Sequence, residues 1–439
     1  MRRCAVLFLG LIMALSFGEA DAESPPIRLT LQQAQQLALS QHPRISVANL
    51  TALAARESAK EARAPFFPNI YGSVTAVGTG DPNNTRLGAG GLNNPLIYER
   101  EAEGVTISQL ITDFGRTLDL TRSAKLRTRA QEMNLEATRE QILLEVNNAY
   151  FSSLAAQSVL DVALATVRSR QPVLQQIQTL ATNKLKSDLD VSFASVDLDQ
   201  AIILLAKATN DLKASFAVLS TLLAEREPHT FVLTDEPMQT NITTDVSALI
   251  LEALAQRPDL ARLRYQRDAA GEFAKAEGKL LYPTVNAIGT AGIIPTGASQ
   301  LPWNYAAAGV NVNIPIFTGG LYTARRREAQ YEAKAADETL RDQENNIVRD
   351  VQISKLNLEY SFQRLALTRQ LLQSATQAMT LAQARFNSGL SSIIELSQAQ
   401  LNQTNADIGL VRASYDYRIQ LALIDFYVGY SDVLPPVQK

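Results

Sequence analysis

Few residues in this sequence could carry covalent or metal chemistry. The chain contains one cysteine, Cys4, and two histidines, His42 and His229, which lie in unrelated contexts. A metal site needs several ligands close together, and no nucleophile–base set or phosphate-binding loop accompanies these residues. We therefore predict that the protein is not an enzyme and that it binds no cofactor and no metal. The formal net charge of −3 also argues against a nucleic-acid partner.

Residues 1–22 have the pattern of a secretory signal peptide. Two arginines precede an apolar run over 5–17, and an A-x-A cleavage site ends at Ala22. The alternative, a membrane-anchoring helix, would need a longer apolar run. Cys4 lies before the apolar run, so it does not fit a lipidation site and is lost with the signal peptide. We predict an exported mature chain that begins at Glu23 and contains no cysteine.

The rest of the chain contains an internal repeat of two similar units. The segment ALSQHP at 38–43 resembles ALAQRP at 253–258, an offset of 215. Further on, GVTISQLI at 104–111 resembles GVNVNIPI at 309–316, an offset of 205. Such self-similarity indicates two copies of one structural unit. We place a first repeat at 23–224, a linker at 225–247, a second repeat at 248–429 and a C-terminal tail at 430–439.

Each repeat is predicted to contain two β-strands. The segment NIYGSVTAV alternates small apolar with polar side chains, which is typical of a barrel strand with one lipid-facing and one water-facing side. Half-buried strands of a soluble sheet would show the same alternation. No stretch after the signal peptide approaches 18 continuous apolar residues, so a membrane crossing would use these strands. We predict strands at about 69–78, 100–112, 284–294 and 305–316.

Long helices follow each pair of strands. The first contains no helix breaker except Pro172, which is expected to bend it, and it would extend for about 100 Å. Apolar residues along it follow the three-and-four spacing of a coiled coil. A shorter helix at about 43–64 is expected to lie end to end with the first return helix, because neither alone covers the long helix. We predict long helices at 116–183 and 321–386, with return helices at 188–224 and 392–428.

Short polar turns separate each long helix from its return helix. In FNSGLSS at 386–392, Gly389 can take the positive φ that ends a helix, and Ser391 or Ser392 can cap the next one. The first copy reads NKLKSDLDV, with Lys184 where the glycine would be and Ser187 as the expected cap. We predict two antiparallel helical hairpins whose tips are these turns.

The ordered set of features resembles the TolC family of outer-membrane efflux proteins. It consists of the tandem repeat, the two strands inserted after Pro68 and after Pro283, the helix starts DFGR and FTGG, and the two tips. Four strands cannot close a barrel, for which about eight are needed, so two or three copies are required. The resemblance selects three. It implies a mainly α fold with a small β part, in which long coiled-coil helices form a trimeric α-barrel and twelve strands form an outer-membrane β-barrel.

The resemblance also implies a function and partners. The trimer would be a passive exit duct of a tripartite efflux or type I secretion system, located in the outer membrane with a long periplasmic extension. Its expected partners are two further copies of itself, a periplasmic membrane-fusion adaptor, an inner-membrane pump of RND or ABC type, and outer-membrane lipid. The alternative is a periplasmic coiled-coil adaptor or structural protein without a pore.

Two groups of site residues follow from the same resemblance. Acidic residues past the tips line the periplasmic aperture in the family; the matching positions are Asp190 and Glu395, while Gln398 stands where a second acid is expected and Ser391 where a basic residue is expected. The alternative is that both carboxylates only stabilise the first turn of a helix. The adaptor-docking tips would comprise Lys184, Leu185, Gly389, Leu390 and Ser391.

Overall fold

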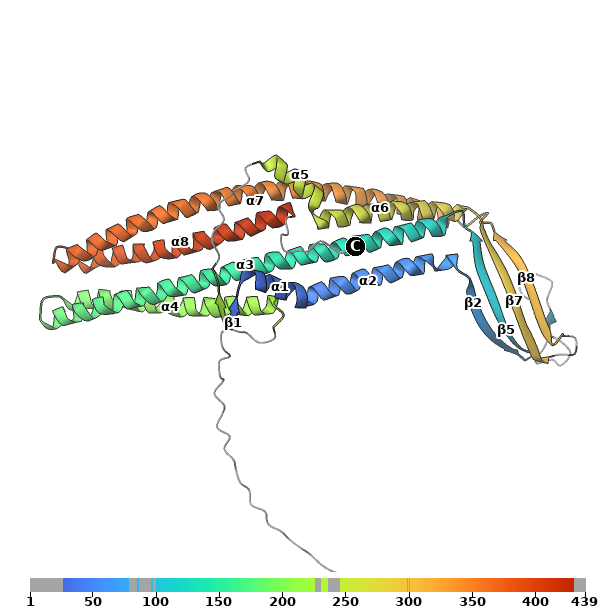
Figure 1. Ribbon diagram of the computed structural model, residues 1–439, viewed down its shortest axis with the longest axis horizontal. Helices are drawn as coiled ribbons and strands as arrows, with labels where there is room; N and C mark the ends of the chain where they lie inside the picture. Colours follow the sequence, from blue (N-terminus) through green and yellow to red (C-terminus); the bar gives the residue numbers. More distant parts are fainter. Residues whose placement is uncertain are drawn as a thin grey trace, which may run out of the picture.

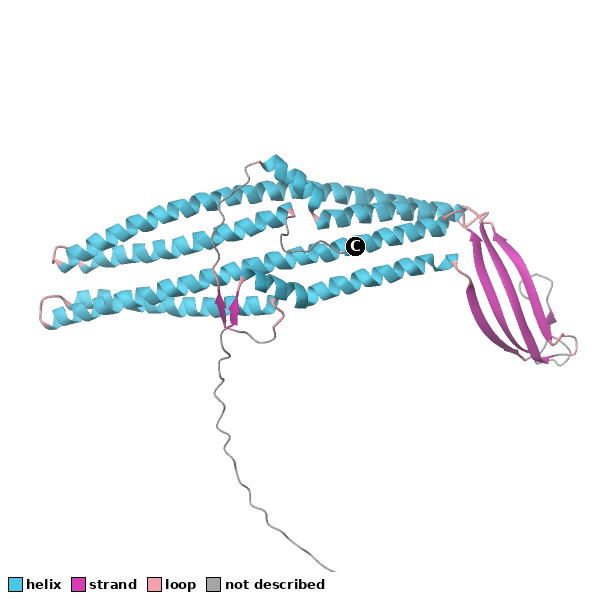
Figure 2. Cartoon of the chain, viewed as in Figure 1, coloured by secondary structure: helices cyan, strands magenta, loops and turns pink. Residues whose placement is uncertain are grey.

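The structure, a computed structural model, describes residues 27–78, 85–86, 96–97, 100–225, 230–235, 245–297, 299 and 301–429. The predicted signal peptide, the C-terminal tail and parts of the predicted linker lie outside these residues. Helices form an elongated body, and the larger sheet stands at one end of it (Figures 1 and 2).

The first half of the chain places a small parallel strand and three helices around one long helix. The elements are β1 (Ile27–Leu29), α1 (Leu31–Gln41), α2 (Pro43–Arg63), a 3₁₀ turn (Ala64–Phe66), β2 (Asn69–Val77), β3 (Thr85–Arg86), β4 (Leu96–Ile97), β5 (Arg100–Thr112), α3 (Arg116–Thr182) and α4 (Asp188–Leu222).

The second half repeats this order. Its elements are β6 (Phe231–Leu233), α5 (Val246–Gln256), α6 (Pro258–Gly278), a 3₁₀ turn (Lys279–Leu281), β7 (Thr284–Gly297), β8 (Asn304–Asn313), α7 (Leu321–Asn387) and α8 (Ile393–Val428). Helices α3 and α7 both have 67 residues, and α2 and α6 both have 21. The strand β8 ends earlier than the predicted 316, because Pro315 has no N–H for the strand ladder.

The larger sheet is antiparallel throughout, with the strand order β2-β5-β7-β8. The register pairs Ile70 with Ile107 and Gly289 with Ile107, so one face is apolar across neighbouring strands. On the other face, the hydroxyls of Thr106 and Thr290 lie 3.2 Å apart. Side chains on the apolar face are exposed: Ile70 is 63%, Val74 78% and Val310 68% exposed. The strands β2 and β8 form the two edges of the sheet.

Helix α3 is the centre of the helical body. It packs against α2 and α6 near the sheet, and against α4 and α8 away from it. Figure 1 shows α4 and α2 following one another along α3, as their lengths predict. Helical structure continues through Pro172. Among the described residues, one window of α3 is apolar enough to cross a membrane by length and composition, with mean hydropathy 1.3.

Part of the predicted linker is structured, which the sequence analysis did not foresee. The strand β6 pairs in parallel with β1, at the other end of the first repeat. The hydroxyl of Tyr150 on α3 lies 3.0 Å from the carbonyl oxygen of Leu29 and 2.8 Å from that of Thr234. Tyr150 therefore fastens this two-stranded sheet to the middle of α3, inside the hydrophobic core that α1, α3 and α4 share.

Candidate functional site

The tip between α3 and α4 consists of the C-terminal turn of α3 and the N-cap of α4. Lys184 has φ +57°, a left-handed conformation that costs a non-glycine residue about 1–2 kcal/mol. The N–H of Leu185 donates to the carbonyl of Leu180 at 2.9 Å, which closes the end of α3. Ser187 then caps α4. The side chain of Leu185 lies on the outside of this turn and is 70% exposed.

The tip between α7 and α8 has the same backbone. Gly389 has φ +73°, so the predicted positive φ is observed. The N–H of Leu390 donates to the carbonyl of Arg385 at 2.9 Å, and Ser392 rather than Ser391 caps α8. Leu390 is 70% exposed, like Leu185 in the first tip. The turn of each hairpin therefore presents a leucine to solvent at an equivalent place.

Asp190 is held inside its own turn. Its carboxylate accepts hydrogen bonds from the backbone N–H of Ser187 at 3.0 Å and from the Ser187 hydroxyl at 2.8 Å. These hydrogen bonds lower the pKa of the Asp190 carboxyl below its usual value. Asp190 thus completes a capping box with Ser187, a structural role that leaves the carboxylate ionised and partly exposed.

Glu395 also makes contacts within its own tip. The Nε of Arg385 donates to the Glu395 carboxylate at 3.0 Å, and both side chains are about half exposed. Gln398 donates to the side chain of Asn402 at 3.0 Å, one turn further along α8. The Arg385 partner was missed by the sequence analysis, because it lies ten residues away across the turn. Asp190 therefore stabilises the first turn of α4, whereas the Glu395 side chain joins the start of α8 to the end of α7.

Contacts between the two hairpins were also missed. The ammonium group of Lys186 lies 5.0 Å from the centre of the Phe386 ring, which joins the first tip to the end of α7. Further from the tips, Ser397 on α8 donates to the carboxylate of Asp197 on α4. The buried Arg170 on α3 lies 3.4 Å from the Thr404 hydroxyl. Arg170 stands at a position of α3 where the coiled-coil spacing predicts an apolar residue. A single charged residue in that apolar pattern could have indicated a buried polar contact.

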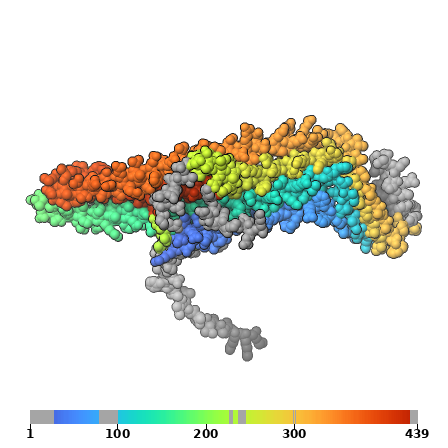
Figure 3. Space-filling model, turned by 45° about the horizontal axis from the view of Figure 1, so that its top comes forward, coloured from blue at the N-terminus to red at the C-terminus, as the bar shows by residue number. Residues whose placement is uncertain are grey.

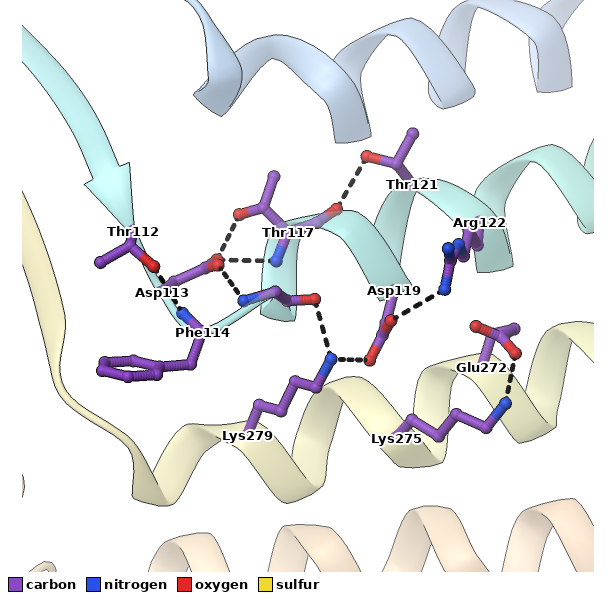
Figure 4. A network of polar contacts seen from close by, with 11 residues as sticks. Thr112, Asp113, Phe114, Thr117, Asp119, Thr121, Arg122, Glu272, Lys275 and Lys279 are labelled. Carbon is purple, nitrogen blue, oxygen red and sulfur yellow. Dashed lines mark hydrogen bonds and ion pairs between the residues drawn. The ribbon is translucent and has the colours of Figure 1, made fainter.

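At the other end of the helices, a polar network joins α3 to α6 (Figure 4). Lys279 reaches the buried carboxylate of Asp119 at 2.6 Å and the carbonyl of Gly115 at 3.2 Å. Arg116 contacts the carboxylate of Glu277 at 3.2 Å. These ion pairs fix the start of α3, where the chain leaves the sheet, against the end of α6, where it enters the sheet again.

Within the described part of the chain, no group of three or more His, Cys, Asp and Glu side chains could hold a metal ion. The arrangement instead consists of a sheet with an apolar face at one end, long packed helices, and two exposed tips at the other end.

Comparison with known proteins agrees with this architecture. A model of the family described as outer membrane efflux protein matches residues 34–225 and 249–430. Outer membrane protein TolC of Escherichia coli K12 is 24% identical, over 98% of this chain and 87% of the relative. The alkaline protease secretion protein AprF of Pseudomonas aeruginosa is 22% identical, over 98% of this chain and 90% of the relative.

Solved structures share the fold. The outer-membrane channel OprN has a TM-score of 0.79 at 20% identity, covering 91% of this chain and 90% of that one. The CmeC outer membrane channel of Campylobacter jejuni also has a TM-score of 0.79, at 15% identity, covering 91% and 85%. The alternative of a pore-less periplasmic adaptor is therefore wrong, and the predicted resemblance to TolC is confirmed. The chain belongs to the outer membrane efflux protein family, and it is an outer-membrane exit duct of an efflux or secretion system.

Proposed function

We propose that the working duct is a homotrimer in which three four-stranded sheets close into one twelve-stranded barrel. The observation that carries this proposal is the pair of free edges on a sheet with an exposed apolar face. Unpaired strand edges are unfavourable within lipid, because their backbone groups find no water there. Strand β5 has 13 residues; at about 3.3 Å per residue and the usual tilt it covers the apolar band of an outer membrane.

The trimer can be tested with purified protein. We expect a mass of three chains in detergent, and discrete conductance steps when the protein is added to a planar lipid bilayer. A stable single chain that inserts without conducting would contradict the proposal. A mass of two chains with conductance would show an eight-stranded barrel instead, which is the smaller closure that the strand number permits.

We infer that the opposite end of the duct docks a periplasmic adaptor, which links it to an inner-membrane pump of RND or ABC type. The support lies in the two tips, where Leu185 and Leu390 project at equivalent places and with equal exposure. A trimer would carry six such leucines on one rim. An exposed apolar side chain in a turn is suited to anchor a helical hairpin of a partner. The proposed docking surface therefore consists of the two leucines together with Lys184, Gly389 and Ser391.

The first turns beside the tips would form the aperture of the duct. In a trimer, Asp190 and Glu395 contribute six carboxylates, and a ring of carboxylates favours cations. The low pKa of Asp190 keeps its charge across the physiological range. Gln398, one turn beyond Glu395, adds a neutral position to the same lining.

The aperture proposal predicts a change in ion selectivity. The variant Asp190→Asn/Glu395→Gln removes both charges, while side-chain oxygens remain to accept the local hydrogen bonds. We expect lower cation selectivity and weaker block by multivalent cations in single-channel recordings. As a matched control, Asp211→Asn/Glu252→Gln removes the same charge from α4 and α5. Equal cation selectivity in the unmodified protein, the double variant and the control would show that the two carboxylates have only a local structural role.

A further inference from the structure

One row of residues crosses the larger sheet near the ends of its strands that lie farthest from the helices. The register pairs Ser73 on β2 with Gly104 on β5, Gly104 with Gly292 on β7, and Gly292 with Tyr305 on β8. Tyr305 is the second residue of β8, whose other end leads to α7. Figure 3 shows the sheet as the terminal part of the elongated body, so this row lies near the far rim of the molecule.

The row belongs to the polar face of the sheet. Gly104 and Gly292 stand two residues from Thr106 and Thr290 along their strands, and alternate residues of a strand share one face. The hydroxyls of those two threonines lie 3.2 Å apart on that face. In the proposed barrel the apolar face meets lipid, so the polar face, with Tyr305, lines the lumen.

The Tyr305 side chain lies along the sheet instead of standing away from it. A Cβ atom built at Gly292, on the neighbouring strand, would stand 2.6 Å from both the hydroxyl oxygen and Cζ of Tyr305, and one built at Gly104, on the strand beyond, would overlap the same oxygen. Strands of a sheet are about 4.8 Å apart, so the ring crosses β7 and its hydroxyl reaches β5. It fits there only because both strands have a glycine, with no side chain, beneath it.

We propose that Tyr305 sets the size limit for solutes at the outer mouth of the duct, and that Gly104 and Gly292 keep its ring against the wall. This inference rests on the proposed trimer, in which three such rings line one level of the barrel. Side chains fill the interior of an eight-stranded barrel, whereas a wider barrel leaves an opening. Three tyrosine side chains standing away from the wall would occupy much of that opening, whereas three rings lying on glycine leave it free for bulky cargo.

The two glycines differ in what an added side chain would displace. A Cβ atom at Gly292 would also overlap the carbonyl oxygen of Glu103, which belongs to the backbone of β5 beside a register shift. At Gly104 the nearest atom is the hydroxyl end of Tyr305, which can move by rotation of the side chain, and the carbonyl oxygen of Ala291 follows at 3.0 Å. Gly104→Ala should therefore turn the ring into the lumen with little change in the strands.

Chemical labelling of an introduced cysteine tests the proposal. The only cysteine of the sequence, Cys4, lies in the predicted signal peptide, so Ser108→Cys would be the one thiol of the mature chain. Ser108 lies on the same face as Gly104 and nearer the helices. A reagent added to intact cells therefore reaches it through the outer mouth. The probes are N-ethylmaleimide and a maleimide attached to a bulky polymer, and the labelling rate is measured for each.

In the Ser108→Cys background, Gly104→Ala should slow labelling by the bulky reagent severalfold and leave labelling by the small reagent unchanged. The further change Tyr305→Ala should restore the rate for the bulky reagent, because the ring is then absent. Gly309→Ala is the matched control: Gly309 lies on the same face, and a Cβ atom there would meet open space. This control should be labelled at the rate of the background protein.

A second variant tests the position of the ring without any change at a glycine. Tyr305→Ala alone should leave the rate for the bulky reagent unchanged, because a ring that lies against the wall obstructs little. A marked increase would show that the ring already stands in the lumen, which overturns the proposal.

The remaining outcomes separate this inference from the proposed function. Equal rates for the bulky reagent in Gly104→Ala and Gly309→Ala would overturn the role of Tyr305 and leave the trimer standing. Slow labelling that persists after Tyr305→Ala is added would show that the new methyl group distorts the strands, which also overturns that role. If N-ethylmaleimide does not label Ser108→Cys at all, the polar face does not line an open lumen, and the proposed barrel itself fails.

Discussion

The variant Leu185→Asp/Leu390→Asp should lose export while its trimer level and its insertion into the outer membrane stay normal. Both leucines are 70% exposed, so a carboxylate at either position remains in water until a partner arrives. Docking would then bury an unpaired charge. A cost of about 3 kcal/mol at each docked tip weakens binding more than a hundredfold.

Export of a dye or drug from whole cells, together with site-directed cross-linking from the tips to the adaptor, would measure this effect. Leu251 on α5 provides the control, because it is also 70% exposed but lies away from the tips. Leu251→Asp should export at the normal rate. Normal export and normal adaptor cross-linking in the double tip variant would show that the tips are solvated turns and that the adaptor binds elsewhere.

The second large effect is expected at the junction between the sheet and the helices. In Lys279→Met, the Asp119 carboxylate, which is only 4% exposed, loses its partner at 2.6 Å. Arg122 approaches the other carboxylate oxygen at 3.8 Å but is itself 58% exposed, so it compensates weakly. Leaving a buried charge without its partner costs about 3–5 kcal/mol. We expect the free energy of unfolding to fall by about that amount, measured by urea denaturation of the helical signal in detergent.

Two further variants check this interpretation. Lys275→Met removes a lysine one turn away, whose pair with Glu272 is exposed at 64% on the lysine side; an exposed pair contributes about 0.5 kcal/mol or less. The double variant Asp119→Leu/Lys279→Met removes both charges and should recover most of the stability. Equal stability of Lys279→Met and Lys275→Met would mean that the ion pair between Asp119 and Lys279, drawn in Figure 4, does not stabilise the junction between the sheet and the helices.

Much of the architecture follows from local pattern in the sequence. The period of a coiled coil needs only neighbouring turns of one helix, so the long and return helices could be predicted within a few residues of their observed ends. Gly389 is similar, because a positive φ at a helix end depends on the residue itself. The repeat offsets added the equivalence of the two tips. The left-handed conformation of Lys184, which stands where the second tip has Gly389, was seen only in the structure.

Other features depended on contacts between distant parts of the chain. The strands β1 and β6 have three residues each, too few to show a period, and they exist because they pair with each other beside Tyr150. Asp119 and Lys279 lie in different repeats, and only the packing of α3 on α6 makes them an ion pair. The role of Asp190 in the capping box of α4, and the pairing of Glu395 with Arg385 across the turn, also became visible only with their hydrogen bonds. Periodicity within the sequence thus determined the elements and their order, whereas side-chain packing between elements decided which charges are buried, which are paired, and which edges are left for a second copy.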